Sequence, residues 1–183
     1  KRGTMVPLML GHRLMGTSLM CTGALAESRA HYDQAIAIYE PAEHRALATR
    51  FGQDMRVAAL SYRSWALWLL GFPDAAGRDA EQALKEAREI GQAATLMYAL
   101  FHTSFTHICC GNYAAASAEA NELVPLADER GSLFWGSLGM LAQGCVFALT
   151  GKISDAVHVI TSGITARRST AATAHEPFCL SQL

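Results

Sequence analysis

The sequence predicts an all-α fold in which about four helix pairs of ~40 residues stack into a superhelical array, an α–α solenoid. Gly71, Gly111 and Gly151 are spaced by 40 residues, and Gly91 and Gly131 repeat this interval half a unit out of phase. A glycine just past a helix end adopts the left-handed conformation without steric cost, so these residues mark helix ends. A fixed period of this length is typical of helical-repeat arrays.

The helices are expected in pairs around these glycines, with Gly23 ending the first of them. In chain order they cover residues 8–22 and 25–40, 54–70 and 73–90, 92–110 and 113–130, and 132–150 and 153–168, with an irregular segment at 41–53. The repeats therefore span 8–40, 54–90, 92–130 and 132–168, and residues 176–183 begin a further helix. We expect a single domain over residues 1–183, and a fragment of a larger protein, because the chain opens with Lys1-Arg2 and no methionine.

Prolines and one serine bear on these bounds. Pro73 stands in the first turn of its helix, where the missing N–H costs little, and Pro41 stops the helix before it. Ser132 is placed to cap the helix over 132–150. Pro125 conflicts with the pattern, because it lies inside 113–130 and should kink or break that helix.

The composition indicates a cytoplasmic protein with a sizeable core. The net charge is −1, without a basic or acidic block, so neither nucleic acid nor an anionic membrane is an expected partner. The longest apolar run, residues 65–70, is far too short to span a membrane. Five cysteines form no CxxC pair, and we expect them to fill the core as reduced thiols rather than to bind metal.

Small side chains recur at matched positions of the units, seven residues before, five after and twelve after each turn glycine, with Leu123 as the larger exception. They are Gly16, Ser64, Ser104 and Gly144; Ser28, Ala76, Ala116 and Ala156; and Ala35, Ala83, Leu123 and Gly163. Closely crossing helices need small side chains where they meet, because the distance between helix axes depends on the size of the contact residues. The pattern predicts that Ala76, Ala116 and Ala156 are buried between the two helices of their own units.

This register resembles that of the tetratricopeptide repeat, in a form longer than the usual ~34 residues. The most specific part of the chain is Tyr39-Glu-Pro-Ala-Glu-His-Arg45, Phe51-Gly-Gln-Asp54 and Leu60-Ser-Tyr-Arg-Ser-Trp-Ala-Leu-Trp-Leu-Leu-Gly-Phe-Pro-Asp74. It resembles the C-terminal repeat region of bacterial multidomain signalling proteins, in which a class III adenylate/guanylate cyclase or other N-terminal domain precedes an AAA-type ATPase domain. The resemblance implies a regulatory or scaffolding array. It implies no catalysis, because the chain has neither the cyclase metal-binding aspartates nor a P-loop.

The first helix of each tetratricopeptide-like unit presents one face to a concave groove, and by this register that face is strongly apolar here. Its candidate binding residues are Trp65, Trp68, Leu69, Tyr98, Phe101, Phe105, Leu141 and Cys145. An exposed apolar surface of this size usually marks an interface. The alternative is that curvature of the array closes the groove and makes these residues core.

A second candidate site lies in the long connection of the first unit. It holds His44, Arg45 and Arg50, with Asp54 just beyond. Long connections in repeat proteins often carry function. The alternative is a solvated segment whose charges pair locally.

No residue set predicts an enzyme. His102 and His107 are five residues apart, which is the wrong spacing for a metal site on one helix face, and no GxSxG, HExxH or phosphate loop occurs. We expect no metal or cofactor. Three hypotheses remain: a protein-interaction or regulatory module that binds a protein or peptide, including other domains of the parent chain; a sensor holding an apolar effector between Trp65, Trp68, Phe101 and Phe105; and a self-associating element.

Overall fold

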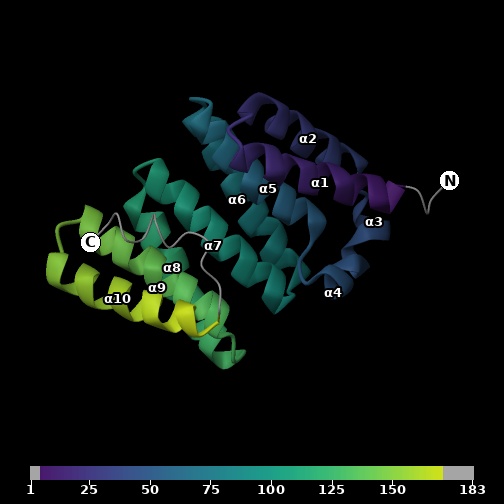
Figure 1. Cartoon of the computed structure of the whole chain (residues 1–183). Coiled ribbons are helices and arrows are strands. Elements are labelled where there is room, and N and C mark those ends of the chain that lie inside the picture. The colour runs from purple at the N-terminus through teal and green to yellow at the C-terminus, as the bar shows by residue number, and fades with distance from the viewer. Residues whose placement is uncertain (1–4, 171–183) are drawn as a thin grey trace.

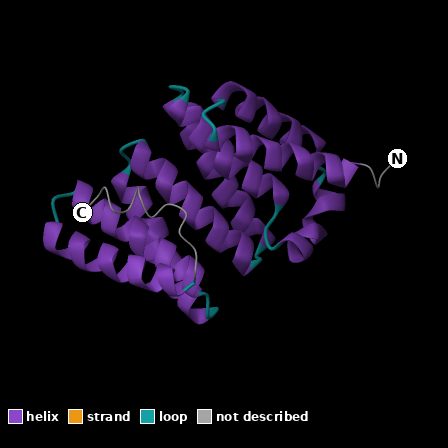
Figure 2. Ribbon diagram, in the orientation of Figure 1, coloured by secondary structure: helices purple, strands orange, loops and turns teal. Residues whose placement is uncertain are grey.

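The computed structural model describes residues 5–170, and all of its regular structure within that range is helical (Figures 1 and 2). The long helices are α1 Met5–Cys21, α2 Leu25–Ile38, α5 Met55–Leu69, α6 Pro73–Ile90, α7 Ala93–Cys109, α8 Tyr113–Glu129, α9 Leu133–Leu149 and α10 Ile153–Ser169. Three short turns of helix, α3 Pro41–His44, η2 Arg45–Leu47 and α4 Ala48–Phe51, connect the first pair to the second. The all-α prediction is confirmed.

The long helices form four successive pairs that stack along the molecule from α1/α2 to α9/α10 (Figure 1). Within each pair the two helices pack together, and α5 also contacts α7, which in turn contacts α9. We call α1, α5, α7 and α9 the A helices and their partners the B helices. The core is continuous from α5 to α10, whose residues share one buried apolar cluster, whereas α1 and α2 contribute to a second cluster with the start of α5.

The turn glycines close the pairs as the sequence predicts. Gly71 and Gly111 have φ values of 86° and 77°, which only glycine adopts without strain. After α5 the Gly71 N–H donates to the Trp68 carbonyl and the Phe72 N–H to the Leu67 carbonyl. This is the Schellman arrangement, and it satisfies carbonyl groups that the helix end leaves open.

The small residues lie at the helix crossings. Ser28, Ala76, Ala116 and Ala156 are all buried, and the Ser28 hydroxyl donates to the Gly16 carbonyl across the first pair at 2.7 Å. Ala116 of α8 packs into a cluster with Ile108 of α7 and with Cys145 and Val146 of α9. The predicted burial of the small residues is therefore confirmed.

Replacing Ala116 with leucine is expected to destabilise the fold by about 1–3 kcal/mol, because extra methylenes in a closely packed crossing force side chains or backbone apart. The measurement is equilibrium urea unfolding. Ala118→Leu is the matched control, since Ala118 is exposed on the same helix. Equal unfolding free energies for the two variants would contradict the assigned crossing.

Three local predictions differ from the structure. Helix α8 runs through Pro125 to Glu129, so the predicted break is wrong. Proline removes one backbone hydrogen bond, and the packing of α8 against both α7 and α9 outweighs that local cost.

The segment 41–53, predicted as irregular, is largely helical, and its last helix, α4, is capped by Gly52. Ser132 occupies the N-cap position of α9 but makes no side-chain capping bond. The helix predicted at 176–183 lies outside the described residues.

Candidate functional site

The apolar A-helix face is partly core and partly surface. Tyr98, Phe101, Leu141 and Cys145 are buried, which places them in the core of the third and fourth pairs. Trp65 and Phe105 are half-buried. At the end of α5, by contrast, Trp68 is 37% exposed and Leu69 52% exposed. The packing of α5, α7 and α9 therefore closes one part of the face and leaves another part open.

The open part holds a pocket of about 190 Å³ between α1, α5 and α7. Its lining residues, which we call the A-helix pocket, are Met20, Trp65, Trp68, Leu69, Phe105, Thr106 and Cys109. Its polar groups are the indole N–H groups of Trp65 and Trp68, the Thr106 hydroxyl and the Cys109 thiol. The Thr106 hydroxyl is within hydrogen-bond distance of Ser64 Oγ and of the His102 carbonyl, and burial raises the pKa of the Cys109 thiol to about 11. The pocket is therefore neutral and apolar at physiological pH.

Aromatic packing holds the tryptophan wall of the pocket in place. The Trp65 indole N–H donates to the His102 carbonyl at 2.9 Å, and its ring stacks on the His102 imidazole with a centroid distance of 4.9 Å. His102 in turn stacks on Tyr98 at 4.1 Å, and the Phe105 ring lies 5.0 Å from the Trp65 ring between their centroids. Trp65 is therefore fixed by packing, whereas Trp68 and Leu69 form an open rim.

Three of the four predicted loop residues lie around Tyr39, whose hydroxyl donates to Asp54, whose ring is 5.6 Å from the His44 imidazole, and which Arg45 also approaches. Asp54 is fully buried as the N-cap of α5, where its carboxylate accepts from the Arg56 and Val57 N–H groups and from the Tyr39 hydroxyl. His44 is also buried, and its Nδ1 accepts from the Glu40 N–H at 2.8 Å. Both side chains therefore hold the connection together.

The two arginines of this connection point to separate partners. Arg45 forms an exposed ion pair with Glu89 at 3.8 Å, and the Arg50 guanidinium lies over the Phe51 ring. Arg45 also lies beside Tyr39, the residue that contacts both His44 and Asp54, whereas the contact given for Arg50 is with Phe51 alone. The contacts of these four residues thus hold the connection in place.

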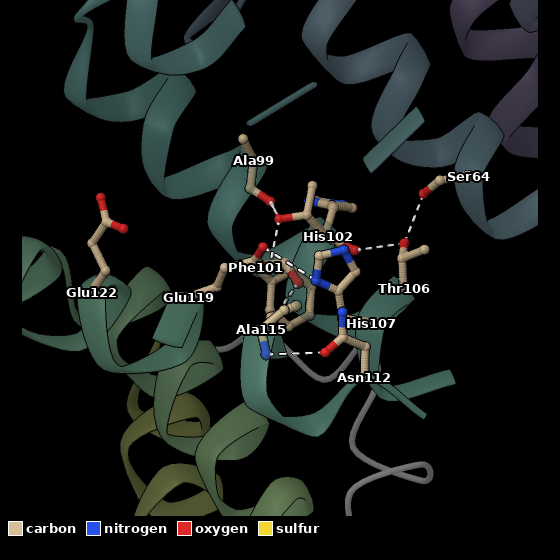
Figure 3. A network of polar contacts seen from close by, with 12 residues as sticks. Ser64, Ala99, Phe101, His102, Thr106, His107, Asn112, Ala115, Glu119 and Glu122 are labelled. Atoms are coloured by element: carbon tan, nitrogen blue, oxygen red, sulfur yellow. Dashed lines mark hydrogen bonds and ion pairs between the residues drawn. The ribbon is translucent and has the colours of Figure 1, made fainter. Parts of the chain in front are cut away.

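The structure also brings together groups that sequence reasoning missed. Thr103 and His107 of α7 contact Glu119 of α8, and all three are buried (Figure 3). The available signal was helical periodicity, because Glu119 occurs among Ala116, Ala120 and Leu123, on the face of α8 that the repeat register places inside. Within residues 5–170 there is no group of three histidine, cysteine or acidic side chains arranged to hold a metal ion, and no helix is long and apolar enough to cross a membrane.

Comparison with known proteins identifies the fold. No family model and no curated protein matches the sequence. Among solved structures, a Rap protein complexed with Competence and Sporulation Factor superposes with a TM-score of 0.69 and 16% sequence identity. The match covers 86% of this chain and 43% of the Rap chain, so the chain spans less than half the length of that protein. At this identity the likeness concerns architecture alone: the chain is a tetratricopeptide-like helical-repeat array.

Proposed function

We propose that this array is a non-catalytic, cytoplasmic protein-interaction and regulatory module of a bacterial signalling protein, which binds a partner segment through the A-helix pocket. The observation that carries the proposal is the neutral, apolar pocket whose rim residues, Trp68 and Leu69, are 37% and 52% exposed. The structural likeness to a Rap protein complexed with Competence and Sporulation Factor supports a binding role for such an array.

The volume of the pocket favours one occupant over another. Sites for small molecules and cofactors usually measure about 300–1,000 Å³. A cavity of about 150 Å³ holds one benzene ring, and the A-helix pocket, at about 190 Å³, is only slightly larger. It therefore suits a single aromatic or branched aliphatic side chain, presented by a longer partner that also covers the rim. An apolar effector held between the aromatic residues remains the alternative function.

The same surface also suits pairing with a second copy of the chain. Burying one large apolar side chain contributes about 1.5–3 kcal/mol, so covering Trp68 and Leu69 gives any of these partners a clear gain. Other domains of the parent protein are candidate partners as well, because the Tyr39–Asp74 segment resembles the repeat region of multidomain signalling proteins. The full reading frame of the gene tests that part of the proposal.

Leu69→Glu is expected to weaken the binding of apolar-anchored peptides at least tenfold. A carboxylate at the rim must lose hydration when the pocket is covered, and the pocket offers it no cation. The measurement is selection of peptides from a displayed random library on the wild-type chain, followed by titration of the selected peptides. Val157→Glu on α10 is the matched control, since Val157 is 45% exposed but lies on a B helix.

Four outcomes separate the candidate functions. Loss of peptide binding in Leu69→Glu but not in Val157→Glu supports the proposed site. Selected peptides that bind both variants like the wild type contradict it. Concentration-dependent sedimentation that Leu69→Glu abolishes identifies a second copy as the partner, whereas thermal stabilisation by small apolar compounds without any peptide binding identifies the effector alternative.

A further inference from the structure

A buried ionisable pair lies on the side of α7 that faces away from the A-helix pocket. Glu119 of α8 is 5% exposed and His107 of α7 is 7% exposed, and the two side chains face each other across the α7–α8 contact (Figure 3). They form the floor of a hollow of about 410 Å³ whose wall is α6. Phe105 and Cys109 stand two positions before and after His107, and both line the A-helix pocket. Residues two apart on a helix face roughly opposite directions, so His107 faces away from that pocket.

The contacts of this pair are incomplete in one respect. Glu119 Oε2 accepts from the Thr103 hydroxyl at 2.9 Å, and Oε1 lies 3.3 Å from His107 Nδ1. Nδ1 is nevertheless without a well-aligned hydrogen bond among the described residues. The Thr103 hydroxyl is also 2.9 Å from the Ala99 carbonyl, so its single proton has two possible acceptors. The cluster can therefore take one more proton without moving any helix.

The surrounding charges do not neutralise the pair. Helix α6 contributes the charged side chains along the hollows beside it, namely Asp74, Arg78, Glu81, Lys85, Arg88 and Glu89. Arg88 is held in an ion pair with Glu122 of α8 at 2.7 Å, and Glu89 pairs with Arg45. Within the described part of the chain, α5 and α9 contribute no charged side chain to these hollows. No cation is thus within ion-pair distance of Glu119 except a protonated His107.

Burial acts on the two groups in opposite directions. It raises the pKa of Glu119 to about 7, against the smaller opposing effects of the Thr103 hydroxyl and Arg88. It lowers the pKa of His107, against the opposing effect of Glu81. Both groups thus disfavour their charged forms, and near neutral pH the pair alternates between a state with one negative charge and a state with one additional proton and no net charge.

We propose that Glu119 and His107 form a shared proton-binding site that fastens α7 to α8 when it holds one proton. In the loaded state that proton lies between Glu119 Oε1 and His107 Nδ1, the two atoms that are 3.3 Å apart, and Thr103 bonds the other carboxyl oxygen. In the empty state, with the imidazole proton on Nε2, the carboxylate keeps the Thr103 bond and no proton lies between Glu119 Oε1 and His107 Nδ1. The tie between the helices is then weaker.

The two residues have opposite effects on the pH dependence of stability. The folded Glu119 carboxyl holds a proton that the unfolded chain, with a pKa near 4.5, has released, so its contribution to stability is present at low pH and is lost as the pH rises through about 7. Folded His107 binds its proton less readily than the unfolded residue, whose pKa is near 6.5, so its contribution is lost as the pH falls below 6.5. In the wild-type chain these two opposite changes of the unfolding free energy with pH largely cancel.

The test is urea unfolding of the whole chain between pH 5 and 8. In Glu119→Gln, His107 is the only member of the pair that still titrates, so the unfolding free energy should rise as the pH is raised from 5 to 7. In His107→Gln, the Glu119 carboxyl is the only member of the pair that still titrates, so the unfolding free energy should fall as the pH rises from 5 to 7.5. Each slope should correspond to on the order of half a proton taken up or released on unfolding. The unfolding free energy of the double variant should not vary with pH in this range, and the control Glu129→Gln, which alters an exposed glutamate at the end of the same helix, should match the wild type.

A second measurement applies even if a variant does not fold. In the wild-type protein, NMR titration of the Glu119 carboxyl carbon and the His107 ring nitrogens should show one common midpoint near pH 7. Opposite slopes in the single variants together with this common midpoint support the shared site. Single variants that keep the wild-type slope, or a Glu119 midpoint near its ordinary 4.5, overturn it.

Discussion

Replacing Arg63 with methionine is expected to destabilise the folded chain by about 3–5 kcal/mol. The Arg63 guanidinium donates to both carboxylate oxygens of Asp79, at 2.6 and 2.8 Å, and to Asp33 at 2.6 Å. These bonds join α5 to α6 within the second pair and to α2 of the first pair. Asp79 is 9% exposed, so removing its partner leaves a nearly buried charge without compensation, while methionine preserves most of the apolar stem.

Arg88→Met is the control for this prediction. Arg88 and Glu122 form an ion pair of similar length, 2.7 Å, but both side chains are well exposed, so the loss should stay below about 1 kcal/mol. Arg63→Lys should fall between the wild type and Arg63→Met, because lysine keeps the charge but cannot make the forked bonds. Urea unfolding measures all three. A similar loss of unfolding free energy in Arg63→Met and Arg88→Met would mean that the bonds of Arg63 to Asp79 and Asp33 contribute no more than an exposed ion pair.

Gly144→Ala is expected to destabilise the fold by about 1–3 kcal/mol, although alanine is the better helix former by about 1 kcal/mol. A Cβ atom at this position of α9 would lie 2.4 Å from Ile160 Cγ1 and 3.2 Å from the Ile160 backbone nitrogen on α10. The two helices must then move apart, which opens the core of the fourth pair. Thermal or urea unfolding measures the loss.

Two other glycines provide controls, because replacing them with alanine should increase the stability of the fold. A Cβ atom at Gly11 of α1 or Gly77 of α6 meets nothing within 4 Å. Gly11→Ala and Gly77→Ala should therefore stabilise the fold by about 0.5–1 kcal/mol through helix propensity alone. Adding Ile160→Ala to Gly144→Ala should make the pair of changes cost less than their sum, because it removes the atom that the new Cβ meets. Additive costs would show that the 2.4 Å contact is not the cause.

The repeat architecture was predictable because its causes are local. A glycine past each A helix, a proline at the start of α6 and small residues at a fixed register each act within one turn or one helix crossing. For that reason the helix pairs lie close to their predicted positions. Pro125 shows the limit of local reasoning, since the packing of α8 on two neighbours overrides the proline that should interrupt it.

The candidate site was less predictable, because exposure depends on how far the pairs curve around one another. Periodicity places Trp65, Phe101 and Leu141 on the same face, yet Leu141 and Phe101 are buried while Trp65 borders a pocket. The sequence register also marked His107 only by its spacing from His102, whereas its contact is Glu119 on the next helix. Such contacts depend on how two helices pack against each other, which the spacing of residues within one helix does not give.

Helix positions, pair boundaries and the small-residue crossings are thus properties of short sequence segments, which fold by hydrogen bonds and packing between near neighbours. The bonds of Arg63 to Asp79 and Asp33, the A-helix pocket and the Glu119–His107 pair exist only after the helices have packed together. Each joins side chains from two or three helices, and stacking alone sets which of their atoms lose water and come within bonding distance.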